Sequence, residues 1–319
     1  MKVAFQIDRN IQFDTDTTFL LIKEAHNRGH DIVIYYPEDI GLLLNNPIAL
    51  AKNIILYDSH FTIKNDIMIH LNEIDIIFIR QNPPLDMRYI TTTYILEKTS
   101  TLVINNPKEI RNSPEKLITS LFPTLIPPTL VTENLSMIKD FYSLYQDIII
   151  KPLYNYGGRD VIRIQDDQNI NVLVELMISK YACPIIIQAF CANIETDKRI
   201  LLLDGDPIGV IKRVPRVSRE IRTNIRLNAS CEPSELNEID KEICRTIGPE
   251  LKKRGLLFVG IDIINNFLLE INTTSPTGIV HFNKLYNIAL EKVLWDCFEQ
   301  KVQLHNQNIS KINAINISH

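Results

Sequence analysis

The chain has 319 residues, of which 45% are hydrophobic and 23% charged, and its formal net charge is −4. This length favours two or three sub-domains, and the charge gives no sign of a nucleic-acid-binding surface. No apolar run approaches the roughly 18 residues of a membrane-spanning helix, and the apolar part of the start, MKVAFQIDRN, is too short for a signal peptide. We therefore expect a cytoplasmic protein without membrane or nucleic-acid partners.

The cysteines give no evidence of a metal centre or a disulfide framework. The chain has five of them, Cys183, Cys191, Cys231, Cys244 and Cys297, and none forms a Cys-x-x-Cys pair. An odd number of isolated cysteines favours reduced, structural thiols.

The first part of the chain alternates strand and helix signals. Short β-rich runs predict strands at 3–7, 31–36, 75–80 and 102–105. A helix is predicted over 15–28, ending at Gly29. This alternation predicts a parallel-sheet α/β domain over residues 1–120, and the proline-rich segment 121–132 marks a boundary. The domain contains no Gly-x-Gly-x-x-Gly motif, so dinucleotide binding has no support.

Beyond this boundary the pattern changes to short strands separated by turns. Strands are predicted at 147–151, 161–164, 185–190, 199–203 and 207–211. Helices are predicted at about 169–181, 235–253 and 283–301. From Gln303 on the chain is polar, and we expect residues 303–319 to form a frayed tail.

The segment LFVGIDIINNFLLEINTTSPT, residues 257–277, has the most informative pattern. Its two apolar runs flank Asn265-Asn266 and predict a β-hairpin. A two-residue loop would place Asp262 and Glu270 on opposite faces, whereas a three-residue loop over 264–266 places them on one face. Asn272 shares the face of Glu270 because side chains alternate along a strand.

Three oxygen-bearing side chains on one face of a hairpin are suited to Mg²⁺, whose other ligands would be phosphate oxygens and water. We therefore expect a three-residue loop and a metal site made of Asp262, Glu270 and Asn272. The alternative is a solvated polar face. That alternative is disfavoured because Glu270 lies inside an apolar run, where a bare carboxylate is costly.

Other residues have the chemistry of a nucleotide site. Lys151 ends an apolar strand and precedes Gly157-Gly158, whose turn amides, with the ammonium group, suit a phosphate. Lys116 lies at a predicted helix start and is a weaker signal. Gln188 and Phe190 could offer a hydrogen-bonding edge and a stacking surface to a base. The alternatives are that Lys151 is an ordinary solvated lysine at a strand end and that 185–190 is an ordinary core strand.

A basic series lies between these residues and the hairpin. Its members are Lys198, Arg199, Lys212, Arg213, Arg216, Arg219, Arg222 and Arg226. Arginine is suited to two-pronged recognition of carboxylates and phosphates. A solvated strand face would explain any single arginine, but it explains the whole series less well.

The order of these residues resembles the ATP-grasp superfamily. The resemblance consists of Lys116, Lys151 with Gly157-Gly158, Asp197-Lys198-Arg199, Arg213, and Asp262 followed by Glu270-Ile271-Asn272. More narrowly, four segments are similar to prokaryotic-type glutathione synthetase: Arg80-x-x-Pro83-Pro84, 93–97 (TYILE), 258–260 (FVG) and 270–277 (EINTTSPT). The match extends from the first strand to about residue 280.

The resemblance implies an N-terminal substrate domain and a two-part ATP-grasp domain over residues 121–302, which holds ATP between antiparallel sheets. The central, lid-like part would span about 125–190 and the C-terminal part about 191–302. It also implies ligation of glycine to γ-glutamylcysteine through an acyl phosphate, with ATP and Mg²⁺ or Mn²⁺, in a homo-oligomer (a dimer or tetramer).

The family's functional residues can be carried over by position. ATP would contact Lys116, Lys151, Gly157, Gly158, Gln188 and Phe190. The metal ligands would be Asp262, Glu270 and Asn272. The catalytic arginines, facing phosphate or substrate carboxylates, would be Arg199, Arg213 and Arg222. Substrate contacts would be Arg80, Asn224, Ser275 and Thr277.

Two departures from the family pattern leave alternatives open. The phosphate turn, Asn155-Tyr156-Gly157-Gly158, has one glycine fewer than the family turn. Segment 222–230, which aligns with a glycine-rich active-site loop, has no glycine and so lacks the backbone freedom that lids use. A ligase with a different amino-acid acceptor therefore stays possible. A nucleotide-binding protein without turnover is disfavoured, because all three metal donors are present.

Overall fold

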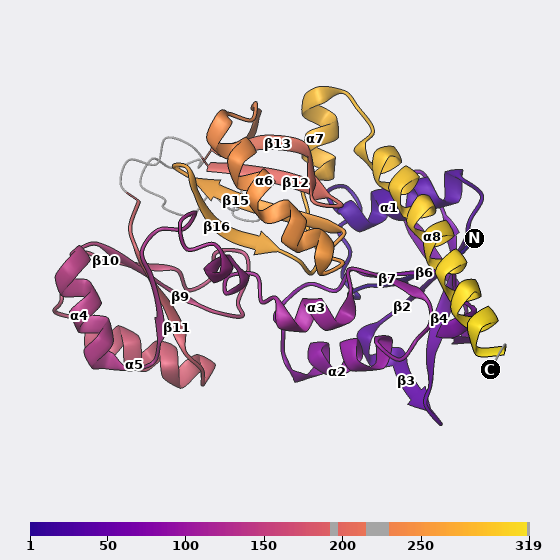
Figure 1. The fold of residues 1–319 in the computed structure, drawn as a ribbon, viewed down its shortest axis with the longest axis horizontal. Coiled ribbons are helices and arrows are strands. Elements are labelled where there is room, and N and C mark those ends of the chain that lie inside the picture. The colour runs from indigo at the N-terminus through magenta and orange to yellow at the C-terminus, as the bar shows by residue number, and fades with distance from the viewer. Residues whose placement is uncertain (192–196, 215–229, 318–319) are drawn as a thin grey trace.

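The computed structural model describes residues 1–191, 197–214 and 230–317, with side chains as far as Lys311. Three sheets follow one another along the long axis of the molecule (Figure 1). The N-terminal sheet lies at one end, a five-stranded sheet in the middle and a four-stranded sheet at the other end. The predicted class is confirmed: an α/β unit with parallel strands is followed by two antiparallel sheets.

The N-terminal sheet is built around four parallel strands, all at predicted positions. They are β1 (Lys2–Gln6), β2 (Asp31–Tyr35), β6 (Ile76–Ile79) and β7 (Leu102–Ile104). The helices of this unit are α1 (Thr17–Asn27), α2 (Met87–Leu96) and α3 (Pro107–Asn112), with 3-10 turns at Pro37–Asp39, Leu71–Glu73 and Ile118–Leu121. Helix α1 begins where Asp16 caps it, accepting the Thr18 N–H at 2.6 Å.

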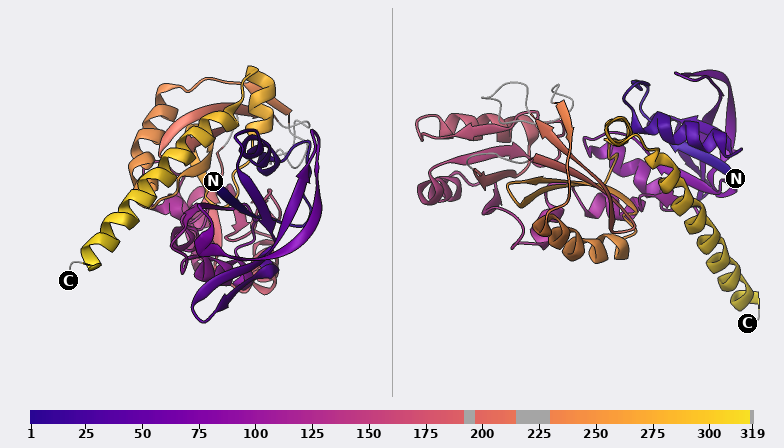
Figure 2. Two further views of the ribbon diagram at one scale, coloured as in Figure 1. Left: turned by 90° about the vertical axis from the view of Figure 1, so that its right-hand side faces the viewer. Right: turned by 90° about the horizontal axis from the view of Figure 1, so that it is seen from above.

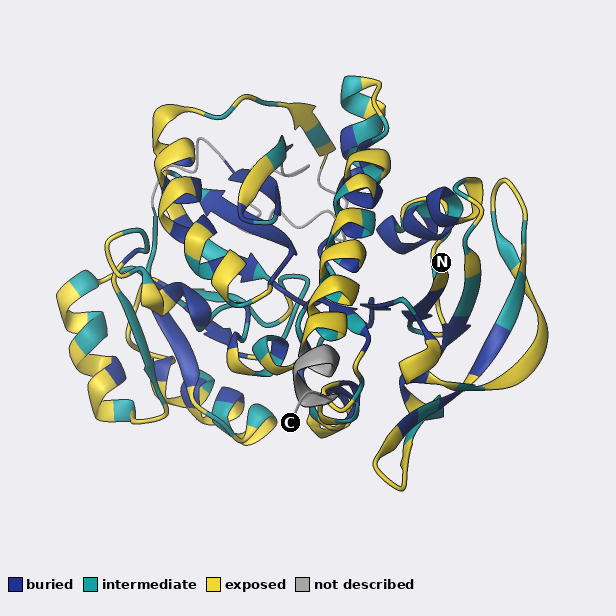
Figure 3. Cartoon of the chain, turned by 45° about the vertical axis from the view of Figure 1, so that its right-hand side comes forward, coloured by how far each residue is buried: buried dark blue, intermediate teal, exposed yellow. Residues whose placement is uncertain are grey.

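The sequence did not predict the antiparallel part of this sheet. Strands β3 (Ile40–Leu43), β4 (Asn46–Leu56) and β5 (Phe61–His70) form an arm over residues 40–70, and β4 joins it to β2. Strand β5 is exposed along most of its length, so its sequence lacks the apolar alternation of a half-buried strand (Figure 3).

The four-stranded sheet has the order β10-β9-β11-β8. Its strands are β8 (Thr129–Thr132), β9 (Ile148–Pro152), β10 (Ile162–Ile164) and β11 (Ile185–Ala189). Helices α4 (Leu135–Tyr145) and α5 (Ile170–Tyr181) pack on one face, against residues such as Ile150 and Ile187. Because side chains alternate, Lys151 and Gln188 project from the opposite face.

The five-stranded sheet has the order β14-β13-β12-β15-β16. Its strands are β12 (Asp197–Leu203), β13 (Asp206–Val214), β14 (Ser230–Pro233), β15 (Phe258–Ile264) and β16 (Phe267–Asn272). Helix α6 (Glu238–Lys253) covers one face and packs on residues such as Ile200 and Ile261. The helix ends before Gly255, whose φ of +68° is left-handed, close to the end predicted at about residue 253.

The C-terminal prediction was wrong in two respects. Two helices, α7 (Ile279–Tyr286) and α8 (Leu290–Ile317), replace the single helix predicted over 283–301, because Asn287 ends α7 with a left-handed φ of 53°. Helix α8 also continues through most of the predicted frayed tail. Its first half is anchored in the core and its second half extends away from the body (Figure 2). None of the described helices is long and apolar enough to cross a membrane.

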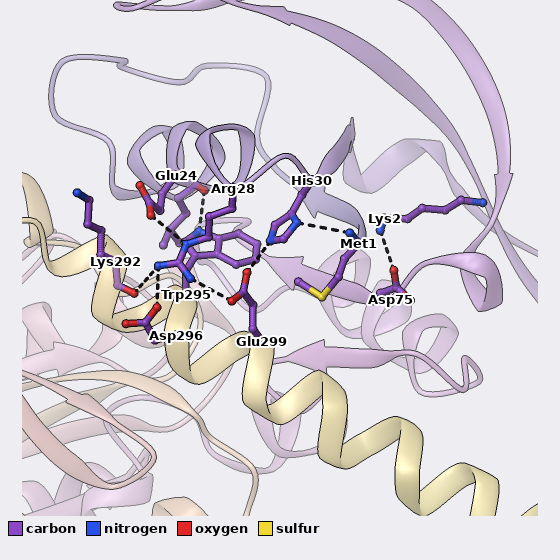
Figure 4. Close-up of polar contacts among 11 residues, drawn as sticks. Met1, Lys2, Glu24, Arg28, His30, Asp75, Lys292, Trp295, Asp296 and Glu299 are labelled. Atoms are coloured by element: carbon purple, nitrogen blue, oxygen red, sulfur yellow. Dashed lines mark hydrogen bonds and ion pairs between the residues drawn. The ribbon is translucent and has the colours of Figure 1, made fainter.

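Helix α8 is fastened to the N-terminal unit by a buried tryptophan and an ion-pair network (Figure 4). The fully buried Trp295 donates its indole N–H to the carbonyl oxygen of Leu21 at 2.9 Å. Arg28 of the N-terminal unit pairs with Asp296 at 2.8 Å and with Glu299 at 3.1 Å. One hydrophobic cluster accordingly contains residues of the N-terminal sheet, the five-stranded sheet and α8.

His30, in this network, is expected to make stability depend on pH. Burial lowers its pKa, and the Met1 amino group (3.4 Å) and Arg28 add to that effect, while Glu299 (3.0 Å) opposes it. The unfolded chain therefore binds a proton more readily than the folded chain. Stability should fall as the pH drops from above 6.5 to below the folded pKa. Urea denaturation at several pH values should show this loss, and His30→Gln should reduce it; identical pH profiles would contradict the assignment.

Candidate active site

The hairpin that holds the candidate metal ligands has a different turn from the one predicted. Asn265 and Asn266, with φ of 47° and 70°, form a two-residue turn that pairs Ile264 with Phe267. A bulge then shifts the register between Asp262 and Ile263, so that Asp262 lies directly opposite Glu270. The prediction of a three-residue loop was therefore wrong. The bulge nevertheless has the effect expected of that loop, because it places Asp262 and Glu270 on the same face of the hairpin. Asp262 and Glu270 line the same cavity.

This first cavity lies between the two antiparallel sheets. The five-stranded sheet contributes Asp197, Arg213, Asp262, Ile264, Leu269 and Glu270. The four-stranded sheet and its loops contribute Ile149, Lys151, Pro152, Asn155, Gly157, Gly158, Arg159, Val161, Gln188, Ala189, Phe190 and Cys191. Lys116 reaches it from the segment before the turn at 118–121. The cavity thus brings together cations, carboxylates and a glycine turn, with apolar side chains beside them.

A second, more polar cavity adjoins the first and shares Gly157, Arg213 and Glu270 with it. Its remaining lining residues are Asn82, Pro83, Glu115, Tyr156, Arg199, Asn272, Thr274, Ser275 and Thr277. Because Asn82 and Pro83 follow strand β6, this cavity also touches the N-terminal unit. Glu270 lies at the boundary, where a group bound in one cavity could react with a group bound in the other.

Asp262 is tied to two buried arginines. Arg199 donates Nε and Nη2 to its two oxygens at 2.5 and 2.9 Å, and Arg213 approaches at 3.3 Å. Burial alone would raise the pKa of Asp262, but Arg199 and Arg213 outweigh it and bring the pKa to about 2. The carboxylate is therefore ionised at neutral pH without any metal.

Asp197, which the sequence analysis did not single out as a site residue, is the main partner of Arg213. Arg213 donates Nε and Nη2 to Oδ1 of Asp197 at 2.8 and 2.5 Å. The other oxygen, Oδ2, is buried without a hydrogen-bond partner, and burial raises the pKa of this carboxyl to about 6. The triplet Asp197-Lys198-Arg199 could have indicated that Asp197 belongs to the site, since an acidic side chain on a buried strand requires a partner of opposite charge.

The two predicted phosphate lysines converge on the first cavity. Lys116 pairs with Glu270 at 3.2 Å and donates to the carbonyl oxygen of Asn155 in the phosphate turn. Lys151 is buried and donates to Gln188 at 3.0 Å. Burial, followed by the charge of Lys116, lowers the pKa of Lys151 to about 8. An anion bound between these lysines would stabilise both charges.

Replacing Lys151 is expected to weaken nucleotide binding without weakening the apo fold. Its buried ammonium is held by one neutral partner and repelled by Lys116, so Lys151→Met removes an unfavourable charge and keeps most of the volume. We expect loss of the ATP-dependent rise in melting temperature, with an apo melting temperature equal to or above that of the wild type. A fall of several kcal/mol in apo stability would make Lys151 a structural residue.

The donor set fits a divalent cation that prefers hard oxygen ligands. Asp262 is held ionised, and Glu270 lines both cavities beside Lys116. Asn272 donates its amide nitrogen to the Gly260 carbonyl at 3.1 Å, which leaves the amide oxygen as its ligand atom. Within the described residues, His, Cys, Asp and Glu alone form no group of three that could hold a metal, so Asn272 would be the third protein ligand beside Asp262 and Glu270.

The other predicted residues separate into three groups. Gly157, Gly158, Gln188, Phe190, Arg199, Arg213, Ser275 and Thr277 line one or both cavities. Arg80 lines neither: it is buried, donating to Thr18 at 3.1 Å and to the Pro276 carbonyl at 3.0 Å, so it holds the 275–277 turn from behind. Arg222 and Asn224, with most of the predicted loop over 222–230, lie outside the described residues.

Two solved structures share this fold across almost the whole chain. A Chryseobacterium gregarium RiPP-associated ATP-grasp ligase has a TM-score of 0.67 at 16% identity, covering 94% of this chain and 97% of its own. D-cycloserine synthetase has a TM-score of 0.69 at 13% identity, covering 95% and 100%. Two antiparallel sheets that face each other across a cleft of lysines, arginines and acidic residues therefore give this chain the ATP-grasp fold.

Sequence comparison gives the family. Residues 1–111 match the N-terminal domain of prokaryotic glutathione synthetase, and residues 115–287 match its ATP-grasp domain. The glutathione synthetase of Anaplasma centrale is 42% identical over 94% of this chain and 97% of its own. Those of Agrobacterium fabrum and Brucella melitensis are 41% and 39% identical, each over 94% of this chain and over 97% and 99% of their own. The chain belongs to the prokaryotic glutathione synthetase family, which uses ATP with a divalent metal ion.

Proposed function

We propose that this chain joins γ-glutamylcysteine to glycine, with conversion of ATP to ADP and phosphate, and so makes glutathione. Transfer of the γ-phosphoryl group of ATP to the cysteinyl carboxylate gives an acyl phosphate, and the amine of glycine then attacks its acyl carbon. The observation that carries the proposal is the pair of adjoining cavities that share Gly157, Arg213 and Glu270. Such an arrangement suits a nucleotide phosphate bound on one side of Glu270 and a carboxylate acceptor bound on the other.

In the first cavity, we assign the nucleotide to residues of both sheets. Lys116 and Lys151 bind its phosphates, with the backbone of Gly157 and Gly158. Gln188 and Phe190 border the base. Phe190 is stacked under the guanidinium of Arg163, 3.6 Å from the ring centre, so the position of its ring is fixed.

Asp262, Glu270 and Asn272 would hold Mg²⁺, or Mn²⁺ in its place. The ion, when bound, supplies positive charge that stabilises the phosphate oxygens during transfer. The chain's own contribution is to hold the two carboxylates in place, through Arg199 at Asp262 and Lys116 at Glu270.

In the second cavity, Ser275 and Thr277 would contact the peptide substrate. Arg199 and Arg213 present positive charge towards its reacting carboxylate and towards the phosphate that leaves it. Arg222 and Asn224 are assigned to the substrate by the family resemblance alone.

Phosphate release by the purified protein tests this function. ATP, Mg²⁺ and γ-glutamylcysteine are supplied with each of a panel of amino acids, and the peptide product is identified by mass. We expect release with glycine above all others. Release with a different amino acid would make the chain a ligase of another acceptor, and ATP binding without release would make it a nucleotide-binding protein without turnover.

We also propose a cytoplasmic homo-oligomer, a dimer or tetramer. The five free cysteines fit a reducing compartment. The arm over residues 40–70 exposes Ile63 (47%), Met68 (58%) and Leu43 (56%), among other apolar side chains, and such a surface is typical of an interface. We assign it to a second copy of the chain. Light scattering of the wild type and of Met68→Glu tests this, and a monomeric wild type would contradict it.

A further inference from the structure

The second cavity contains a buried carboxylate that none of the roles above uses, that of Glu115. The residue lies between α3 and the 118–121 turn, next to Lys116, and its exposed fraction is 7%. It lines the cavity together with Glu270, Asn272, Thr274, Ser275 and Thr277. It therefore lies on the substrate side of the boundary that Glu270 marks.

The contacts of Glu115 occupy one of its two carboxylate oxygens. Oε1 accepts the backbone N–H of Thr274 at 3.2 Å and its hydroxyl at 2.7 Å. Among the described residues, no donor binds Oε2. Oε2 is also absent from the fully buried polar atoms that lack a partner, so this oxygen is accessible. The second oxygen thus reaches the cavity, held in position by the bonds that Thr274 makes to the first.

Glu115 differs from the other carboxylates of the two cavities in lacking a cation. Asp262 pairs with Arg199, Asp197 with Arg213, and Glu270 with Lys116. Within the part of the chain that the structure describes, no lysine or arginine forms an ion pair with Glu115. A buried carboxylate without a partner of opposite charge is costly, so a cation bound in the cavity would stabilise Glu115.

The ligation brings two ammonium groups to this side of the site, that of the acceptor amino acid and the α-ammonium of the γ-glutamyl residue. Glu115 lies next to Glu270, since its backbone carbonyl accepts the N–H of Ile271 at 2.9 Å, so it lies beside the boundary where the acyl phosphate forms. The acceptor nitrogen must reach that boundary, whereas the γ-glutamyl ammonium lies at the other end of the dipeptide. We propose that Glu115 binds the acceptor ammonium through Oε2 and places the acceptor nitrogen beside the acyl phosphate. The inference rests on the proposed function and names the acceptor subsite within it. It makes Glu115 a specificity residue that favours amines arriving as cations, such as free amino acids.

The chemical step itself balances without any further reactant. The acceptor nitrogen forms a bond to the acyl carbon, and the bond from that carbon to the phosphate oxygen breaks, so that inorganic phosphate leaves. The ammonium loses two protons on becoming an amide, one to the phosphate and one to water. Glu115 supplies binding and orientation, which are needed only while the acceptor is charged.

Glu115→Gln separates this role from a structural one. The glutamine oxygen can still accept both bonds from Thr274, while the charge facing the cavity is lost. Rates are measured with glycine and with hydroxylamine, a small acceptor that is largely uncharged at neutral pH and traps the acyl phosphate as a hydroxamate. We expect KM for glycine to rise about ten- to hundredfold, as for loss of a charged hydrogen bond. The KM values for ATP and γ-glutamylcysteine, and the rate with hydroxylamine, should stay within about twofold.

Thr274→Val is the matched control, because it removes a bond to Glu115 but keeps the carboxylate. It should change KM for glycine less than Glu115→Gln does. Glu115→Gln should melt as the wild type, whereas Thr274→Val should melt somewhat below it because it loses a buried hydrogen bond. An unchanged KM for glycine in Glu115→Gln, or equal losses with glycine and hydroxylamine, would overturn the inference and leave the proposed function intact. A wild type that releases no phosphate with either acceptor would overturn both.

Discussion

Glu270→Gln is expected to lower the rate of ligation by roughly 10²-fold or more while the protein stays folded. Glu270 lines both cavities and pairs with Lys116, so the substitution removes a negative charge at the point where nucleotide and substrate meet. The volume is unchanged, and the carboxylate is only partly buried (21% of the side chain exposed), so little of the core depends on it.

The measurements are turnover as a function of Mg²⁺ concentration and the melting temperature of the apo protein. Glu232→Gln is a matched control, since Glu232 is exposed on strand β14 of the same sheet. The control should keep both properties. Near-normal turnover of Glu270→Gln at limiting Mg²⁺ would show that Glu270 is not a metal ligand.

Asp262→Ala is expected to abolish ligation and also to destabilise the protein, by about 3–5 kcal/mol, the usual cost of breaking a buried ion pair. Its carboxylate accepts hydrogen bonds from Nε and Nη2 of the buried Arg199 and lies 3.3 Å from Arg213. Removing it leaves the buried Arg199 without its main acceptor, whereas Arg213 keeps Asp197.

Urea denaturation of the apo protein measures this loss. The double substitution Arg199→Met with Asp262→Leu should recover much of the stability, because it removes the unpaired charge, but it should recover no activity. Equal apo stability of the wild type and Asp262→Ala would mean that the Arg199 pair contributes little, and that Asp262 serves only the ligand.

Sequence patterns predicted the parts of this protein in which local signals agree with the tertiary structure. The four parallel strands are short apolar runs, and α6 has a capping residue at its start and a glycine at its end, so both were found. The arm over residues 40–70 was missed because β5 buries neither face. The length of α8 was missed because its second half has a polar sequence that continues from a packed first half.

Within the site, too, local sequence signals predicted some features, and features that depend on tertiary structure were missed. Asp262 and Glu270 could be predicted to share a face, but the reason given, a longer loop, was wrong. A bulge leaves no mark in the residue types, because any residue can occupy it. The pairing of Asp262 with Arg199 depends on strand neighbours 63 residues apart in sequence, and the pairing of Asp197 with Arg213 depends on the register of β12 against β13. Arg80 lines neither cavity, because its guanidinium donates to the carbonyl oxygen of Pro276, and the sequence motif around Arg80 does not reveal that contact.

The hydrophobic cluster that α8 completes has a mechanical consequence. It unites the N-terminal sheet and one face of the five-stranded sheet, whereas the four-stranded sheet has a separate cluster with α4 and α5. We propose the division into residues 1–120, about 125–190 and about 191–302 on this basis, with the first and third moving as one rigid body. The four-stranded sheet, with α4 and α5, would then be the part that moves when the cleft between the two antiparallel sheets opens and closes. Hydrogen exchange should slow in β9 and β11 when ATP binds, while β1 and β6, protected already, should change little.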